Sequence, residues 1–274
     1  MTSLAELRDS RELLVNLTQR EVRGKYKRSV LGQAWSLLNP LAQVLVFTVV
    51  FSLFLRIPPD VGDPSGLESF ALQLLAALLP WAFFANAVNQ GMGSLLGNAN
   101  LVKKVYFPRE ILVASTVLAL VVTFATELLV LLAAVLVFGG LGVVPHLVVV
   151  PYLVLCLTAF GLGLGLMLSV SNVYFRDTTQ FVGILLQVWF YLTPVIYSLD
   201  YVAQADVDIA GFGAEDLLKL NPMTHFVGAF RAVFYDFRFP SLAQLLVITL
   251  VAAGSLVLGY LVFRRFEGRL AEEL

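Results

Sequence analysis

The chain has 274 residues, of which 59% are hydrophobic and 14% charged, and its formal net charge is −1. A soluble domain carries about 25% charged residues, so this composition excludes a water-soluble globular domain and predicts an integral membrane protein. The single Cys156 excludes an intrachain disulfide and a cysteine zinc cluster.

Residues 1–36 form a basic segment that precedes the first apolar run. Val22, Tyr26 and Val30 fall on one stripe of a helix beside a stripe of cations, which predicts an amphipathic helix at the membrane interface. Two leucines project to another side, and Gly24 is a position where the helix can break. Cations near anionic lipid contribute about 1 kcal/mol each. The candidates for headgroup contact are Arg20, Arg23, Lys25, Lys27 and Arg28.

Six apolar stretches follow, each near the length of about 20 residues that a helix needs to cross the hydrocarbon core. Backbone groups in lipid must be satisfied internally, so the expected fold is an all-α integral membrane protein with six transmembrane helices. Continuous apolar runs contradict the alternation of a β-barrel. The helices are expected at about 37–57, 70–92, 112–138, 144–170, 181–199 and 241–263, within a membrane domain of residues 37–263 that precedes a tail of residues 264–274.

The distribution of positive charge predicts the orientation. Of the 18 lysines and arginines, 14 fall on the side that carries both ends of the chain and 4 on the other. The positive-inside rule therefore places both termini in the cytoplasm. The last external segment, residues 200–240, is acidic by contrast.

The second cytoplasmic loop, residues 98–110, reads N-A-N-L-V-K-K-V-Y-F-P-R-E. Asn98 or Asn100 can cap a short helix there, and Pro108 ends it. Such a helix carries an apolar face into the cytosol, which indicates a docking helix for a partner. An ordinary loop whose lysines only set the topology is the alternative. In the next cytoplasmic turn Arg176 stands beside Asp177, either as part of a helix cap or as a second partner contact.

Glu127 is the only ionisable residue deep within any of the six predicted helices. An intramembrane carboxylate is costly, so it marks either a functional group facing protein or a wet cavity, or a structural hydrogen bond between helices. Gly161 and Gly165 make a G-x-x-x-G face for close helix packing. The sequence has no Walker A loop, and His146 and His225 lack ligand spacing. It therefore predicts neither nucleotide binding nor a metal site in this chain.

Aromatic side chains concentrate in the first and fifth predicted helices. Phe47 and Phe51 lie about one turn apart and either face lipid and neighbouring helices or line a channel. Trp189 and Tyr191 carry polar groups near mid-span, which favours a partly polar passage.

The external segment ends in a helix predicted over residues 220–234. Asn221 caps this helix and Pro222 takes its first position, while Phe226 and Phe230 belong to an apolar stripe. At about 21 Å the helix is too short to cross the membrane. It should be re-entrant or lie at the outer interface, with surface anchoring alone as the alternative.

Motifs in five places, in the same order along nearly the whole chain, resemble the membrane subunits of type-2 ATP-binding-cassette (ABC) exporters for cell-surface polysaccharides such as O-antigen, capsule and teichoic acid. Each motif alone is weak, and together they are specific. They are R-G-K-Y-K-R-S-V-L-G-Q-A-W-S-L-L-N-P (23–40), L-V-K-K-V-Y-F-P-R-E (101–110), N-V-Y-F-R-D (172–177), L-T-P-V-I-Y (192–197) and N-P-M-T…R (221–231).

The resemblance implies a homodimer of six-helix subunits that pairs with two copies of a cytoplasmic ABC ATPase in the inner membrane of a bacterium. ATP and Mg are then expected on the ATPase, and this chain is expected to bind no cofactor, to carry no catalytic residue and to have no nucleic-acid partner. The implied substrate is an undecaprenyl-diphosphate-linked glycan, and the N-terminal cations suit its diphosphate.

The resemblance also implies roles for particular residues. The channel aromatics are Phe47, Phe51, Trp189 and Tyr191, and the outer-gate residues are Asn221, Pro222, Phe226 and Phe230. The residues expected to couple the chain to the ATPase are Leu101, Val102, Lys103, Lys104, Tyr106, Phe107, Pro108, Arg109, Glu110, Arg176 and Asp177.

Three other functions stay open at this point. A type-2 exporter of a drug or small lipid differs only in its substrate. A secondary transporter should show inverted repeats or several charges within the membrane, and the sequence has neither. A membrane-bound glycosyl- or acyltransferase needs a cluster of acids or histidines at one interface, which the sequence offers only weakly in the acidic segment 200–240.

Overall fold

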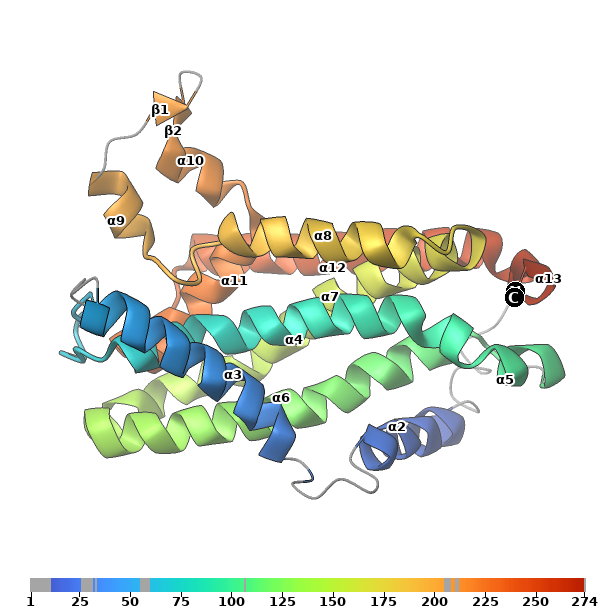
Figure 1. Cartoon of the computed structure of the whole chain (residues 1–274), viewed down its shortest axis with the longest axis horizontal. Helices are drawn as coiled ribbons and strands as arrows, with labels where there is room; N and C mark the ends of the chain where they lie inside the picture. The colour runs from blue at the N-terminus through green and yellow to red at the C-terminus, as the bar shows by residue number, and fades with distance from the viewer. Residues whose placement is uncertain are drawn as a thin grey trace.

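The computed structural model describes residues 11–25, 32, 34–54, 60–105, 107–204, 208–209 and 212–273. Long helices lie side by side along the longest axis of the molecule, and short elements gather at its two ends (Figure 1). The long helices are α3 (Ala34–Phe47) with its π-helical continuation η1 (Thr48–Phe54), α4 (Phe70–Gly97), α6 (Glu110–Gly139), α7 (Val150–Tyr174), α8 (Thr178–Tyr191) and α12 (Leu242–Phe266).

One end, on the right of Figure 1, carries the segments near both termini. Its short elements are α2 (Arg11–Lys25), α5 (Ala99–Lys104), η4 (Glu267–Arg269) and α13 (Leu270–Glu273). The basic loops and the tail share this end, as the charge distribution predicts. That this end faces the cytoplasm stays a prediction.

The opposite end carries the segments expected outside. Its short elements are η2 (Gly140–Val149), α9 (Leu199–Gln204), β1 (Asp208–Ile209), β2 (Phe212–Gly213), α10 (Ala214–Lys219), α11 (Pro222–Arg231) and η3 (Ala232–Asp236). The strands form a two-residue antiparallel pair, with Asp208 opposite Gly213. The described fold is otherwise helical.

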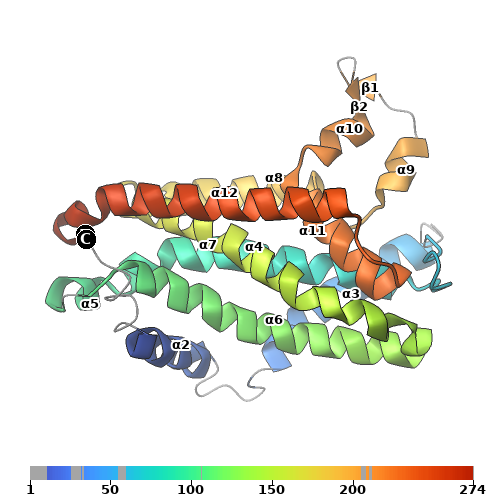
Figure 2. The same ribbon diagram turned by 180° about the vertical axis from the view of Figure 1, so that it is seen from behind.

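Each of the six predicted spans overlaps one of the helices along the longest axis of the molecule, although α8 has only 14 residues. Three stretches are long and apolar enough by themselves to cross a membrane, namely Phe70–Gly97, Glu110–Tyr174 and Leu242–Phe266. The second of these folds back at η2, so that α6 and α7 run in opposite directions (Figure 2). The chain is therefore a membrane protein with several apolar helices.

Two helix ends differ from the prediction because of prolines. α8 ends at Tyr191 rather than near residue 199, since Pro194 lacks an N–H and disfavours helical backbone before it. α7 begins at Val150 rather than 144, with Pro151 in its first turn, where a proline is tolerated.

Small residues let α7 pack closely between α4 and α12. A Cβ at Gly161 would meet Ala87 of α4, and one at Gly91 of α4 would lie 3.2 Å from the Cα of Gly165. The G-x-x-x-G face is thus a helix-packing face, as predicted. Gly163 lies against the backbone of α12 on the other side of α7, a contact that the sequence analysis did not predict.

α2 ends one residue after Gly24 and packs along α6 (Figures 1 and 2). Leu17 is buried, and Leu13 and Leu14 are partly buried with it in an apolar cluster that includes residues of α5, α6 and α7. The stripe predicted through Val22 is therefore not the main packing face of α2. The other two members of that stripe lie outside the described residues.

Candidate functional site

A groove of about 410 Å³ lies between α3, α4 and α8. Aromatic rings and primary amides both line it, on helices that are otherwise mostly apolar. Rings present flat apolar faces, and amides donate and accept hydrogen bonds, so the groove suits a ligand with both apolar faces and hydroxyl groups. The rings are those of Phe47, Trp81, Phe190 and Tyr191, and the amides are those of Gln43, Asn86 and Gln187.

Two of the four expected channel aromatics, Phe47 and Tyr191, line this groove. Phe51 instead stacks on Phe70, with 6.0 Å between the ring centroids. Trp189 also lies elsewhere. It is partly buried in the core, because its indole ring packs against rings of α4 and α7.

Trp81 and Phe190, whose ring centroids lie 5.6 Å apart at the groove, are not among the channel residues predicted from the sequence. The amides of Gln43 and Asn86 are likewise absent from the predicted sites. A primary amide within an apolar helix could have indicated these groove residues from the sequence, because a buried amide needs a polar partner.

Asn221 joins the end of α8 to the start of α11. Its Oδ1 accepts hydrogen bonds from Trp189 Nε1 at 2.8 Å and from the backbone N–H of Met223 at 3.0 Å. Its Nδ2 donates to the carbonyl oxygen of Leu192 at 3.0 Å and to Thr193 Oγ1 at 2.9 Å. The predicted helix cap is confirmed, and the same side chain also holds the L-T-P-V-I-Y segment in place.

Arg231 holds the same segment from the end of α11. Its guanidinium donates to the carbonyl oxygens of Pro194 at 3.2 Å, Val195 at 3.1 Å and Tyr197 at 3.3 Å. A planar guanidinium suits several carbonyls at once because its donors point in fixed directions. Asn221 and Arg231 thus clamp residues 192–197, so two motifs far apart in sequence are in contact.

The phenylalanines of the expected outer gate lie in the core. Phe226 stacks on Phe160 at 5.7 Å, and Phe230 meets Phe124 edge-on at 5.8 Å. Both are fully buried, so α11 is inserted into the bundle and does not lie on its surface. The two rings anchor α11 and do not face an opening, since apolar burial against α4, α6 and α7 is more favourable than exposure.

The short helix expected in residues 98–110 is present as α5, six residues long at the basic end, and its coupling role stays a prediction. Val102 is buried against α6 and its neighbours, whereas Lys103, Lys104 and Val105 are exposed. Leu101, Phe107 and Pro108 are partly buried, and Tyr106 lies outside the described residues. The lysines are therefore accessible to a partner, and Val102 holds α5 onto the bundle.

The F-P-R-E motif contacts the C-terminal tail. The Arg109 guanidinium donates to the backbone carbonyl of Glu267. The neighbouring Glu110 is 7% exposed, and both its carboxylate oxygens are buried without a hydrogen-bond partner. Tyr174 of the N-V-Y-F-R-D motif lies edge-on to Phe266 at 6.2 Å, and its hydroxyl is also buried without a hydrogen-bond partner. Two motifs of the loops predicted to be cytoplasmic thus meet the tail at this end.

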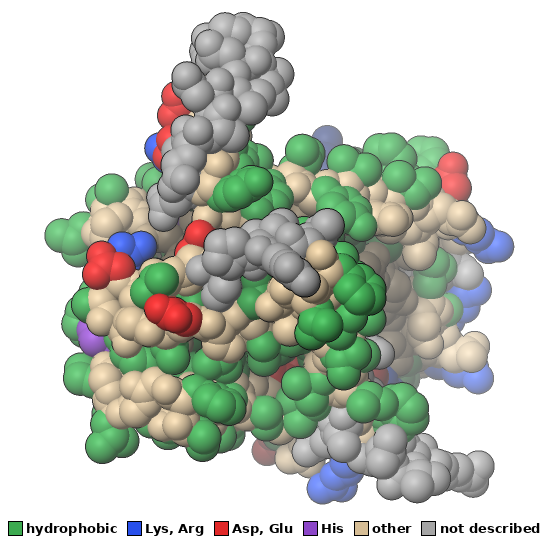
Figure 3. All heavy atoms as spheres, turned by 60° about the vertical axis from the view of Figure 1, so that its left-hand side comes forward, with side chains coloured by type: hydrophobic (Ala, Val, Ile, Leu, Met, Phe, Trp, Pro, Cys, Tyr) green, Lys and Arg blue, Asp and Glu red, His purple; other side chains and the backbone are tan. Residues whose placement is uncertain are grey.

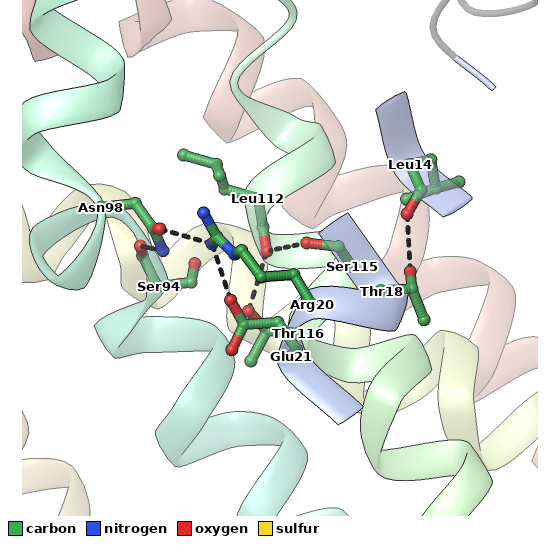
Figure 4. Close-up of polar contacts among 9 residues, drawn as sticks. All are labelled: Leu14, Thr18, Arg20, Glu21, Ser94, Asn98, Leu112, Ser115 and Thr116. Atoms are coloured by element: carbon green, nitrogen blue, oxygen red, sulfur yellow. Dashed lines mark hydrogen bonds and ion pairs between the residues drawn. The ribbon is translucent and has the colours of Figure 1, made fainter. Parts of the chain in front are cut away.

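The structure gives Arg20 a protein partner, drawn in Figure 4. Its guanidinium donates to Asn98 Oδ1 and to Glu21 Oε1, each at 2.7 Å. Asn98 makes no capping bond to α5, because its amide donates to the carbonyl of Ser94 and accepts from Arg20. Arg23 is exposed and Lys25 ends α2, while the remaining headgroup candidates, Lys27 and Arg28, lie outside the described residues.

The structure also places the Arg176–Asp177 pair and Glu127, whose roles the sequence left open. Arg176 and Asp177 are exposed in the turn before α8, and the Asp177 side chain makes no capping hydrogen bond. That leaves the pair accessible to a partner. Glu127 is 9% exposed and lies within the bundle on α6, away from lipid.

A bundle of apolar helices with a ring-and-amide groove and accessible basic loops at one end defines a membrane subunit of a transporter. Residues 12–235 match the family of ABC-2 type transporters. The chain belongs to that family, and the resemblance predicted from its motifs is confirmed.

Three relatives match over nearly their full lengths. The chain is 32% identical to the O-antigen export system permease protein RfbA of Myxococcus xanthus, over 97% of this chain and 96% of the relative. It is 25% identical to the RfbA permease of Klebsiella pneumoniae, over 96% and 95%. It is 24% identical to the polysialic acid transport protein KpsM of Escherichia coli, over 90% and 91%.

Proposed function

We propose that this chain is the membrane subunit of an ATP-driven exporter that moves a lipid-linked cell-surface polysaccharide across a bacterial inner membrane. Its relatives include permeases named for O-antigen export and for polysialic acid transport. The observation that carries the proposal is the groove between α3, α4 and α8, which is lined by both rings and amides. Rings can stack on the flat faces of sugars while amides bond their hydroxyls.

The proposal includes the partners. Two copies of the chain form the passage, with the grooves of the two copies facing each other, and two ATPase subunits bind ATP and Mg. The exposed Lys103 and Lys104 of α5 and the exposed Arg176 and Asp177 meet the ATPase. The carrier lipid is undecaprenyl diphosphate, whose charge is matched by Arg23 and the cations that follow it.

The groove supplies the test. Ala85 lines it and is partly buried, so Ala85→Trp fills the space between α3, α4 and α8. Ala133→Trp is the matched control, because Ala133 is exposed on α6, away from the groove. Both variants should reach the membrane in wild-type amounts and co-purify with the ATPase.

We expect Ala85→Trp to abolish surface polysaccharide and to leave lipid-linked glycan inside the cell, whereas Ala133→Trp should export normally. Immunoblots of surface glycan and extraction of the lipid-linked pool measure both quantities. Normal export by Ala85→Trp would contradict transport through this groove. Loss of a small-lipid cargo with intact polysaccharide would reassign the substrate.

A further inference from the structure

A second, more polar cavity of about 260 Å³ lies at the outer end of the bundle. Gln73 at the start of α4 and Pro194 just after α8 both line it, so it lies nearer than the groove to the ends of these two helices. Gln73 precedes the groove residue Leu78 by five positions, which is about 7.5 Å along α4 and about 140° around it, so the cavity and the groove lie on different faces of that helix. The space-filling view of this end shows acidic side chains gathered on it (Figure 3).

Hydrogen bonds hold the walls of the outer cavity in place. Gln73 Nε2 donates to Asp60 Oδ2 at 2.8 Å, and the Tyr235 hydroxyl donates to the carbonyl oxygens of Asp60 at 2.6 Å and Leu67 at 2.8 Å. Arg238 pairs with Asp236 at 3.3 Å. A cavity whose walls are already fixed loses little conformational entropy when a ligand binds.

The Thr224 hydroxyl takes part in none of these hydrogen bonds. The Thr224 side chain lines the outer cavity and also an adjoining one of about 670 Å³ between α11 and the start of α12. Thr224 is 2% exposed, and its hydroxyl is buried without a hydrogen-bond partner. A buried hydroxyl in that state is unfavourable, so it calls for a partner that arrives from the cavity. Asp63, also on the lining, makes no ion pair with a described residue and offers an acceptor.

The charges of the lining select the ligand. Three aspartates and two arginines line the outer cavity, so the formal charge of its lining is −1. This negative field disfavours phosphate and carboxylate groups and accepts uncharged hydroxyls. The cavity falls below the roughly 300 Å³ at which pockets for drug-sized ligands begin, which suits a single small polar unit.

We infer that the outer cavity is a subsite for one uncharged sugar residue of the exported polymer, held by the Thr224 hydroxyl and the Asp63 carboxylate. The inference rests on the proposed function and adds a second place, apart from the groove, where a sugar of the polymer is bound. It assigns a preference for neutral sugars over uronic acids.

Sugar binding by the full chain in nanodiscs tests the subsite without ATP hydrolysis. The probes are D-glucose, D-galactose, D-mannose and L-rhamnose, with D-glucuronate as the charged comparison, and saturation-transfer NMR reads their contact with the protein. We expect signals from at least one neutral sugar and none from D-glucuronate. The double variant Thr224→Val with Asp63→Asn should bind about tenfold more weakly.

Thr126→Val is the matched control, because the Thr126 hydroxyl bonds only to its own helix, on α6. It should bind the sugars as the wild type does. Thr224→Val alone should melt at the wild-type temperature or above it, since it removes an unpaired hydroxyl. A lower melting temperature would instead show that the hydroxyl has a structural partner, and would overturn the inference.

Three other results would also overturn the inference. One is the absence of a signal from every neutral sugar, and another is an equal signal from the wild type and the double variant. The third is a D-glucuronate signal as strong as those of the neutral sugars. Export in cells is measured in parallel. A wild-type chain that exports polysaccharide without binding sugars would remove the subsite alone, whereas a wild-type chain that exports none would remove the proposed function.

Discussion

The clamp that Asn221 forms between α8 and α11 gives the sharpest stability prediction. Asn221 makes four hydrogen bonds that tie the end of α8 to the start of α11, through Trp189, Met223, Leu192 and Thr193. Replacing it by alanine removes all four and leaves an indole N–H and a backbone N–H without their acceptor. A net contribution of about 0.5–1.5 kcal/mol for each bond predicts a loss of about 2–6 kcal/mol in the free energy of unfolding.

Asn221→Asp separates the two halves of this clamp. The aspartate keeps an oxygen for Trp189 and for the backbone N–H of Met223, and its charge is favourable at the start of α11. It loses the amide N–H bonds to Leu192 and Thr193 and sets an oxygen against the Leu192 carbonyl. We therefore expect a smaller loss than with alanine, about 1–2 kcal/mol.

Unfolding of the purified chain in mixed micelles, followed by tryptophan fluorescence, measures these differences. Asn16→Ala is the control, because Asn16 is exposed on α2, and it should change the unfolding free energy by less than about 0.5 kcal/mol. Asn221→Ala should also alter the emission of Trp189, whose indole loses its partner. An unfolding free energy for Asn221→Ala equal to that of the control would refute the clamp.

The positions of the long helices followed from the sequence because lipid imposes a strong rule. Backbone groups must be bonded within the helix and about 20 apolar residues are needed to cross, so hydropathy indicates where each long helix lies. The errors at the end of α8 and the start of α7 arise where Pro194 and Pro151 override hydropathy with backbone geometry.

The direction in which each helix face points was harder to predict from the sequence. A helix that is apolar on all sides has no periodic pattern to distinguish a groove from a packing face. Phe47 and Tyr191 were therefore placed as channel residues on the same grounds as Phe51 and Trp189, and only the first two line the groove. Likewise, the stripe through Phe226 indicated an amphipathic helix without showing that its apolar face is inserted in the core.

Contacts between distant polar residues were outside the reach of the sequence. The cap positions near Asn98 and Asn221 are readable from local pattern, but their partners are not. Asn98 bonds Arg20, 78 residues away, and Asn221 bonds Trp189, 32 residues away. Such bonds depend on how helices cross, which tertiary packing decides. These bonds give structural partners to Arg20 and Trp189, which the sequence had assigned to lipid headgroups and to a channel.

Two further predictions concern buried ionisable groups. Tyr235→Phe should lower the unfolding free energy by about 1–3 kcal/mol, because the two carbonyls of Asp60 and Leu67 lose their donor. Burial raises the pKa of Tyr235 to about 12 from the ordinary 10.0, so the folded state favours the neutral phenol. Its stabilisation is complete below pH 10 and is lost as the pH rises towards 12, and a pH series of unfolding should show a shallower alkaline decline in Tyr235→Phe than in the wild type. Glu110→Gln should raise the unfolding free energy by about 1–3 kcal/mol, because a neutral amide is less costly to bury without partners than a carboxylate. Glu267→Gln is its control: that carboxylate pairs with an arginine at 3.1 Å and is partly exposed, so its loss should change stability by less than about 1 kcal/mol. If Glu110→Gln melts below the wild type while Glu267→Gln does not, the Glu110 carboxylate has a stabilising partner at the basic end, and its burial cannot then be counted as a cost.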